Sequence, residues 1–404
     1  MKRGTLILLL FLTLVGGAIR FFQLSEPDEI TGDEVYFVNF SRAYVNQEYF
    51  FDVHPPLGKM INALGQMLFG NRPIGWRFMP ALFGTLLIPL AYWLGKIATG
   101  KNFVGLGLSL ITAFDGLLFV ESRLGLINII YLTFLVVAYA CMFQCLHSLK
   151  TAIRWLILGG IFLGLAVSTK WVAWFAVPPM LMFVIFFYQL DSRPPVFSLV
   201  KRLWLASLIL IVLPLLISYL VWLFHFYLVD SEGSFLINQI KIFQYHTGIS
   251  ETHAYQSPWW SWLLLWRPFP HLIESDKTVK IITGLGNPAI WWPAIVIVLA
   301  SLKRQVRQKA SVILILIALF FHLATFGLVS RPMFLYHALP AFYFLGILGL
   351  NGAEIIFARR KYQCLAVWAV FVILVFWVFY PIYTGQELSQ SSLQLREWLP
   401  GWLH

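Results

Sequence analysis

The sequence has few charged residues and very little cysteine. Charged residues make up 12% of its 404 residues and apolar residues 59%, whereas a soluble domain has about 25% charged and roughly 45–50% apolar residues. This shortage of charge excludes an ordinary soluble domain and indicates a protein that crosses a membrane several times. The three cysteines, Cys141, Cys145 and Cys364, all lie in apolar runs, so neither a disulfide framework nor a zinc site is expected.

Several other patterns are missing. The apolar runs do not alternate with polar residues, as the strands of a membrane barrel would. No internal repeat or low-complexity tract interrupts the chain, so we expect one domain over residues 1–404. There is no Asp-x-Asp motif and no cluster of three histidines. We therefore predict that no metal cofactor is essential, although the acidic residues could hold a divalent cation.

The apolar residues form eleven runs long enough to cross a bilayer as helices. They cover residues 4–24, 78–98, 103–120, 124–146, 153–169, 171–190, 202–226, 288–302, 310–329, 333–351 and 363–381. The first run is about 20 residues long and lacks a clear small-x-small cleavage site, so we expect a retained helix rather than a signal peptide. The predicted class is an all-α membrane protein whose two ends lie on opposite sides of the membrane.

The net charge of +11 is unevenly distributed. Sixteen of the 29 Lys and Arg residues fall on the side of the N-terminus, whereas only Asp191 and Glu354 of the 18 acidic residues do. The basic residues on that side are Lys2, Arg3, Lys96, Lys101, Lys150, Arg154, Arg193, Lys201, Arg202, Lys303, Arg304, Arg307, Lys309, Arg359, Arg360 and Lys361. The positive-inside rule predicts a cytoplasmic N-terminus and an outer C-terminus. The basic excess is thus a topology signal rather than evidence of nucleic-acid binding.

Two predicted outer segments, residues 25–77 and 227–287, are too long to be simple connections. The first contains a helix-like stretch from Glu34 to Asn46, and a second candidate helix starts after Pro55-Pro56. In that second helix apolar residues recur at helical spacing, and we expect both helices to lie on the membrane surface. These apolar residues are Leu57, Ile61, Leu64 and Leu68.

The first outer segment holds the best catalytic candidates. Asp33-Glu34 could cap the following helix, or one carboxylate could act as a general base on an attacking hydroxyl. The stretch Asp52-Val-His54-Pro-Pro-Leu-Gly-Lys59 is stiffened by its prolines. It could form a rigid turn, or Asp52, His54 and Lys59 could line a polar pocket.

Distant segments deliver further charged or titratable residues to the same predicted face: Arg123, Lys170, and Arg331 with His337. Each cation alone could extend to the lipid headgroups. Together they suit an anionic phosphate, which arginine binds through paired hydrogen bonds. A carboxylate base facing phosphate-binding cations at a bilayer surface indicates a transferase that uses a lipid-linked phosphate donor.

These motifs resemble the protein O-mannosyltransferase family along essentially the whole chain. The first segment carries Asp33-Glu-Val-Tyr-Phe and Glu48-Tyr-Phe-Phe-Asp-Val-His-Pro-Pro-Leu-Gly-Lys59. The later matches, in family order, are Glu121-Ser-Arg123-Leu, Ser168-Thr-Lys-Trp171, Ser257-Pro-Trp-Trp-Ser-Trp262, Gly286-Asn-Pro-Ala-Ile-Trp-Trp292 and Arg331-Pro-Met-Phe-Leu-Tyr-His337-Ala-Leu-Pro.

The resemblance implies a GT-C glycosyltransferase with a polyprenyl- or dolichyl-phosphate-mannose donor and a Ser/Thr hydroxyl acceptor on a protein. It implies inversion at the sugar carbon, with Asp33 as the base, Glu34 as its acidic partner and Arg123 as a functional arginine. Trp259 and Trp260 would either anchor the chain at the membrane interface or contact acceptor or lipid.

The chain also departs from the family pattern. The large MIR insertion of eukaryotic members does not fit in residues 227–287, which together with the absence of an ER retention signal favours a prokaryotic plasma membrane. The aspartate that usually follows the functional arginine is replaced in Ile127-Asn128, and Ala338 stands where many members have an aromatic residue.

Other functions remain open from the sequence. A related GT-C enzyme that glycosylates a lipid or a cell-wall glycan would use the same donor chemistry. A transporter would place charges near the bilayer midplane and often shows internal repeats, neither of which is found here. A non-catalytic scaffold is the third alternative.

Overall fold

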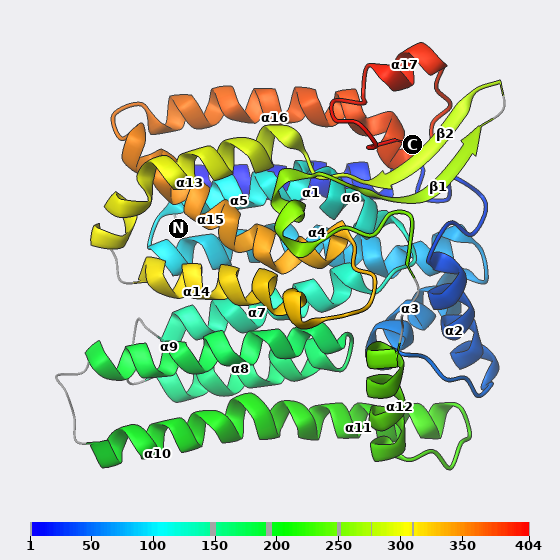
Figure 1. The fold of residues 1–404 in the computed structure, drawn as a ribbon, viewed down its shortest axis with the longest axis horizontal. Helices are drawn as coiled ribbons and strands as arrows, with labels where there is room; N and C mark the ends of the chain where they lie inside the picture. Colours follow the sequence, from blue (N-terminus) through cyan, green and yellow to red (C-terminus); the bar gives the residue numbers. More distant parts are fainter. Residues whose placement is uncertain are drawn as a thin grey trace.

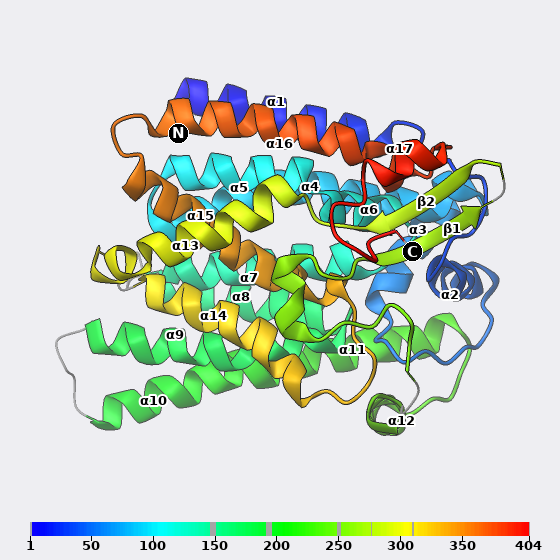
Figure 2. The same ribbon diagram turned by 45° about the horizontal axis from the view of Figure 1, so that its top comes forward.

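The computed structural model describes residues 2–145, 151–190, 196–248, 252–275, 277–308 and 311–403. It is a bundle of long, roughly parallel helices with shorter elements gathered at one end (Figure 1). The N-terminus lies at the opposite end of the bundle from the C-terminus in both views (Figures 1 and 2). Four residues of the predicted charge pattern, Lys150, Asp191, Arg193 and Lys309, lie outside the described residues.

The eleven apolar runs lie mainly in helices. The long helices are α1 (Arg3–Phe21), α4 (Pro73–Thr99), α5 (Asn102–Phe114), α6 (Gly116–Arg123), α7 (Asn128–Cys145), α8 (Ala152–Val167), α9 (Val177–Leu190), α10 (Val196–Ser207), α11 (Leu213–Leu228), α13 (Pro288–Gln308), α14 (Ser311–Ala324), α15 (Leu339–Ile356) and α16 (Lys361–Thr384). Among the described residues, eight helices are long and apolar enough to cross a membrane, and the number is nine when the bent pair of α5 and α6 is counted as one span. Two further apolar helices, Ala152–Val167 and Trp171–Phe186, are shorter.

The third apolar run is broken, which its composition did not predict. Helices α5 and α6 meet at an angle of 56° around Asp115. The buried Asp115 carboxylate caps α6, because its Oδ1 accepts a hydrogen bond from Leu118 N at 3.0 Å. Its Oδ2 accepts bonds from Asn287 N at 2.8 Å and Trp291 Nε1 at 2.9 Å. The motif Gly286–Trp292 therefore fixes the direction of α6.

Three short helices lie at the end of the bundle away from the N-terminus: α2 (Glu34–Asn46), α3 (Leu57–Phe69) and α12 (Phe235–Gly248). Helix α2 has the predicted bounds. In α3 the polar residues Lys59, Asn62 and Gln66 are buried, whereas Leu64 and Leu68 are exposed. The predicted apolar stripe thus faces away from the protein, as expected where a helix meets lipid. Helix α12 crosses the long helices and is seen end-on in Figure 2.

An antiparallel hairpin, β1 (Phe269–Ser275) and β2 (Val279–Gly284), lies in the second outer segment, and the predicted all-α class did not include it. Its register shifts between Pro270 and Leu272, so His271 is the extra residue of a β-bulge. A pair of backbone hydrogen bonds between Val279 and Leu388, both 2.9 Å, ties the hairpin to the chain before α17 (Gln390–Gln394).

The end of α13, the start of α14 and the connection from α15 to α16 lie at the same end as the N-terminus (Figure 1). Basic residues lie at this end, with Arg307 near the end of α13, Arg359 and Arg360 between α15 and α16, and Lys361 at the start of α16. The acid-rich loop before α2 lies at the other end, so the charge asymmetry of the sequence follows the long axis of the bundle.

Candidate active site

Asp33 is half-buried at the N-terminus of α2. Within the described part of the chain, no hydrogen bond or ion pair engages its carboxylate. The preceding Gly32 has a φ of +49°, and a Cβ there would lie only 2.8 Å from the carbonyl oxygen of His271. Gly32 therefore permits both the turn before Asp33 and the close approach of strand β1.

Glu34 lies in a different environment from its neighbour. It is fully buried, and its oxygens accept hydrogen bonds from Arg77 Nε and Nη2, both at 2.9 Å, and from Gly125 N at 2.7 Å. Thr31 adds two more through its backbone N and its hydroxyl, both at 3.0 Å. These five bonds occupy the Glu34 carboxylate, so only Asp33 of the predicted pair is available to a substrate.

Arg77 was not singled out from the sequence because it directly precedes the apolar run 78–98. Its guanidinium also donates to the carbonyl oxygens of Leu24 at 3.3 Å, Pro27 at 2.8 Å and Glu29 at 2.8 Å. The Arg77–Glu34 pair therefore holds the whole loop before α2. A lone arginine at the acid-rich end of a membrane span was the available signal.

Lys170 is buried near Asp33. Its Nζ donates to Asn128 Oδ1 at 2.6 Å, and Asn128 Nδ2 donates to Glu121 Oε2 at 2.9 Å. Burial lowers the pKa of Lys170 to about 8; Glu121 raises it, Arg331 lowers it and Asp33 raises it. These charged groups from three separate segments therefore act on one ammonium group.

Arg331 also acts on Lys170, and it is hydrogen-bonded to a histidine that the sequence analysis did not select. Arg331 Nη1 donates to His246 Nδ1 at 2.7 Å, and His246 Nε2 donates to the Val53 carbonyl at 3.1 Å. Burial and then Arg331 lower the pKa of His246 to about 4, so its ring is neutral at pH 7. The His54 ring lies 5.8 Å from the His246 ring, and burial followed by Lys170 and Arg331 lowers its pKa well below the usual value.

The other two predicted pocket residues of the first segment bind one another. Lys59 and Asp52 form a buried ion pair, and Lys59 Nζ also donates to the carbonyl of His54 at 2.6 Å. Leu57 N donates to the Ser168 carbonyl at 2.9 Å, which fixes this loop against the segment that carries Lys170. The ion pair of Asp52 and Lys59 thus holds the loop that carries His54.

His337 is buried among aromatic rings, stacked on Tyr336 at 4.6 Å and on Trp262 at 6.0 Å. The predicted tryptophans take other positions: Trp260 is 64% exposed, and Trp259 packs against Gly327. For Trp260 the structure favours the interfacial alternative. The tryptophan that stacks on His337 is Trp262, which the sequence analysis had not selected as a site residue.

Arg123 is engaged by backbone carbonyl oxygens, and its predicted role in phosphate binding stays a prediction. Its guanidinium donates to the carbonyl oxygens that end α1, and this set consists of Ile19 at 3.3 Å, Arg20 at 2.8 Å, Phe22 at 2.7 Å and Gln23 at 2.8 Å. It lines a separate cavity of about 240 Å³ with Gln23, Lys280 and Gln386. The observed contacts make it a cap for a helix C-terminus.

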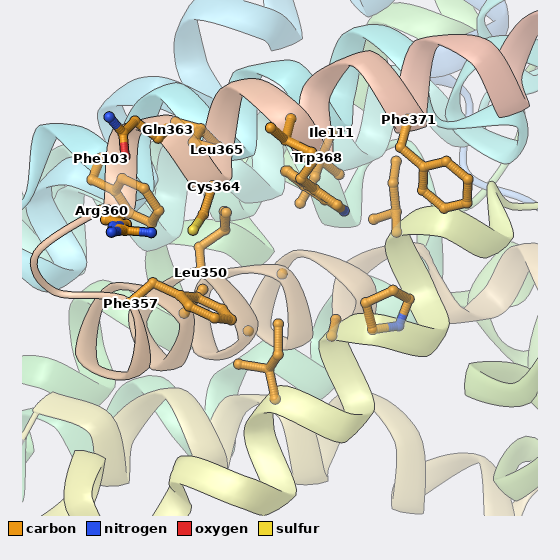
Figure 3. A pocket seen from close by; sticks show the side chains of 18 residues that line it. Phe103, Ile111, Leu350, Phe357, Arg360, Gln363, Cys364, Leu365, Trp368 and Phe371 are labelled. Carbon is orange, nitrogen blue, oxygen red and sulfur yellow. The ribbon is translucent and has the colours of Figure 1, made fainter.

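A larger cavity of about 580 Å³ lies between α5, α13, α15 and α16 (Figure 3). Its walls are mostly apolar, with Arg360 and Gln363 at one end. Its lining includes none of the candidate site residues. Within the described residues, no group of three or more His, Cys, Asp or Glu side chains is placed to hold a metal ion.

The fold is similar to those of known membrane glycosyltransferases. The yeast Pmt1-Pmt2 protein O-mannosyltransferase complex, solved with its sugar donor, matches with a TM-score of 0.85 at 18% identity, over 100% of this chain and 93% of that one. ArnT from Cupriavidus metallidurans, solved with undecaprenyl phosphate, matches with a TM-score of 0.61 at 17% identity, over 94% and 71%. The fold is therefore the one that these GT-C membrane glycosyltransferases share.

Comparison of the sequence identifies the family to which the chain belongs. The family model described as dolichyl-phosphate-mannose-protein mannosyltransferase matches residues 10–76 and 73–229. The model of the C-terminal four-helix membrane region of protein-O-mannosyltransferase matches residues 231–402. The polyprenol-phosphate-mannose–protein mannosyltransferase of Mycolicibacterium smegmatis is 27% identical over 431 aligned positions, covering 88% of this chain and 83% of the relative. The corresponding enzyme of Corynebacterium glutamicum is 24% identical, over 88% and 82%. The chain belongs to the protein O-mannosyltransferase family and is a glycosyltransferase.

Proposed function

We propose that this protein transfers mannose from a polyprenyl-phosphate carrier to Ser or Thr hydroxyls of proteins, with Asp33 as the base. One observation carries the assignment: the unpaired Asp33 carboxylate lies within electrostatic reach of a buried cation, Lys170, on which Arg331 also acts. The names of the bacterial relatives support both the donor and the protein acceptor.

The proposed reaction is a single displacement. The acceptor hydroxyl oxygen attacks the anomeric carbon, and its proton passes to Asp33. The bond from that carbon to the phosphate oxygen breaks, and its electron pair stays on the polyprenyl phosphate. Because the Glu34 carboxylate is fully hydrogen-bonded, it positions Asp33 and takes no part in covalent chemistry. One displacement inverts the configuration at the sugar carbon.

Lys170 and Arg331 would stabilise the charge that grows on the departing phosphate. Tyr131 and Tyr336 place their rings 5.7 Å and 5.1 Å from Lys170 Nζ, so the ammonium group sits in a largely dry environment. Fixed charges act most strongly where water is excluded. His337 stacks on Tyr336 beside Lys170, and its ring Nε2 has no partner among the described residues.

The charge asymmetry supports a location for the site. We place the N-terminus in the cytoplasm and the site and C-terminus outside, in a prokaryotic plasma membrane. Lipid-linked donor, acceptor and catalytic loop would then meet at the outer membrane face.

The decisive experiment supplies membranes containing the protein with labelled polyprenyl-phosphate-mannose and a Ser/Thr-rich peptide. We expect label on the peptide, with none when every Ser and Thr is replaced by Ala. Label recovered only on lipid or glycan would favour the related GT-C reaction and contradict a protein acceptor. Unchanged transfer in the presence of EDTA is expected if no metal is essential.

A further inference from the structure

Two buried polar side chains beside Asp33 have atoms without a protein partner. They are Glu121 at the end of α6, whose Oε1 is unpaired, and His271 on strand β1, whose two ring nitrogens are unpaired, counting partners among the described residues. The side chains are 0% and 1% exposed. Buried polar atoms are nearly always hydrogen-bonded, so such a pair indicates a place for a polar ligand.

The geometry suits a small group between the two side chains. His271 Nε2 lies 4.0 Å from Glu121 Oε1, which is too far for a direct hydrogen bond. One oxygen atom between them can accept from the imidazole N–H and donate to the carboxylate. Burial lowers the pKa of His271 while Asp33 and Glu34 raise it, so the ring is neutral and offers one donor.

The fold holds both side chains in place. His271 is the extra residue of the β-bulge, and its backbone is packed against Gly32, directly before Asp33. The other oxygen of Glu121 accepts a hydrogen bond from Asn128, whose own oxygen accepts one from Lys170. The side-chain amide of Asn128 therefore links Lys170, the cation assigned to the phosphate, with the Glu121 carboxylate, whose other oxygen is free.

We propose that Glu121 and His271 form a subsite that binds a hydroxyl of the sugar in the lipid-linked donor. In such a donor the sugar is joined directly to the phosphate, so a phosphate at Lys170 places sugar hydroxyls near Glu121. A hydroxyl both donates and accepts, which matches a carboxylate facing a neutral imidazole. Within the described residues, the ligands for a metal ion at this place are too few. This inference rests on the proposed function, because it assumes the lipid-phosphate-sugar donor.

The test compares two lipids on purified protein: polyprenyl-phosphate-mannose and polyprenyl phosphate without the sugar. Wild-type protein should bind the mannosylated lipid more tightly. Glu121→Gln keeps the shape of the side chain but weakens the charged hydrogen bond, so the preference should fall by roughly tenfold. Binding of the bare lipid phosphate should change less than binding of the mannosylated lipid, because only the mannosylated lipid would contact Glu121. Glu48→Gln, which alters an exposed glutamate on the same end of the molecule, should leave both affinities unchanged.

The outcomes separate the subsite from the proposed function. If Glu121→Gln keeps the full preference for mannose, or weakens both lipids equally, the subsite is wrong while the donor assignment stands. If wild-type protein binds neither lipid, the proposed function is wrong. A series of 2-, 3-, 4- and 6-deoxymannose donors tests the same contact without altering the protein. One member should bind more weakly to wild type and show no further loss with Glu121→Gln; equal binding of all four would also overturn the subsite.

Discussion

At the scale of single residues, the adjacent carboxylates of Asp33 and Glu34 lie in different environments. Glu34 is enclosed by five hydrogen bonds, including a bidentate ion pair, whereas Asp33 has no polar partner within the described residues. A buried ion pair with every lone pair satisfied can fix a backbone. The chain therefore uses one acid to position the other, and a substitution should distinguish their roles.

Replacing the unpaired acid removes the proposed base with little change in shape. We expect Asp33→Asn to lower kcat for mannose transfer by roughly 10²–10⁴-fold, the usual contribution of a general base. Donor binding and thermal stability in detergent should stay near wild type, because no described hydrogen bond depends on this carboxylate. The matched control is Asp28→Asn, in the same loop but exposed, which should retain activity. Wild-type turnover by Asp33→Asn would contradict the assignment.

Lys170 should give the reaction an alkaline limit. Its pKa is lowered to about 8, so the side chain is a cation below that pH and becomes neutral as the pH rises through it. A neutral amine attracts phosphate weakly, so kcat/KM for the donor should fall above about pH 8, since this ratio reports the free enzyme. Lys170→Arg keeps its charge throughout and should remove the limit even if the rate is lower. A pH profile that is the same in both proteins would exclude Lys170 as its source.

Single residues also show where sequence reasoning reached its limit. Asp33, Lys170, Arg331 and His54 could be chosen because charged or titratable groups beside apolar runs are unusual. His246 and His271 could not, since nothing in their local sequences marks them and their partners come from distant parts of the chain. Arg123 satisfied the same charge criterion as Lys170 but turned toward the end of α1.

At the scale of secondary-structure elements, helices were predictable and their interruptions were not. The bounds of α2 follow from its sequence, and α3 starts after its prolines as expected. The break at Asp115 depends on Asn287 and Trp291, which lie far away in the chain. The position of the hairpin likewise depends on tertiary packing. Strand β1 approaches Gly32 so closely that a Cβ atom there would clash with the His271 backbone.

This close approach can be tested with two glycines that both have a positive φ. Gly32 and Gly70 have φ values of +49° and +79°, so alanine is strained at either site, at a cost on the order of 1–3 kcal/mol of stability. Only Gly32→Ala also pushes a Cβ against the His271 carbonyl, whereas nothing lies within 4 Å at Gly70. We expect Gly32→Ala to reduce kcat/KM by roughly tenfold or more, because small displacements of reacting groups are costly. Equal activity of the two variants would show that β1 does not position Asp33.

At the scale of the whole molecule, the bundle has two chemically different ends. One carries the N-terminus and basic connections, and the other carries the acid-rich loop, the hairpin and the candidate site. The distribution of Lys and Arg along the sequence predicted this asymmetry, because the positive-inside rule acts on short loops. The number of spans was less predictable, since α8 is short and the α5–α6 pair is bent.

The orientation of the molecule can be measured with single cysteines at its two ends. Ser391, in α17 at the end with the hairpin, and Ala358, in the connection before α16, are both exposed and uncharged. In a background with Cys141, Cys145 and Cys364 replaced, a membrane-impermeant maleimide added to intact cells should label Ser391→Cys and spare Ala358→Cys. Lysis should then expose Ala358→Cys to the same reagent. The opposite labelling pattern would put the candidate site in the cytoplasm, where the donor would have to present its sugar on the inner leaflet.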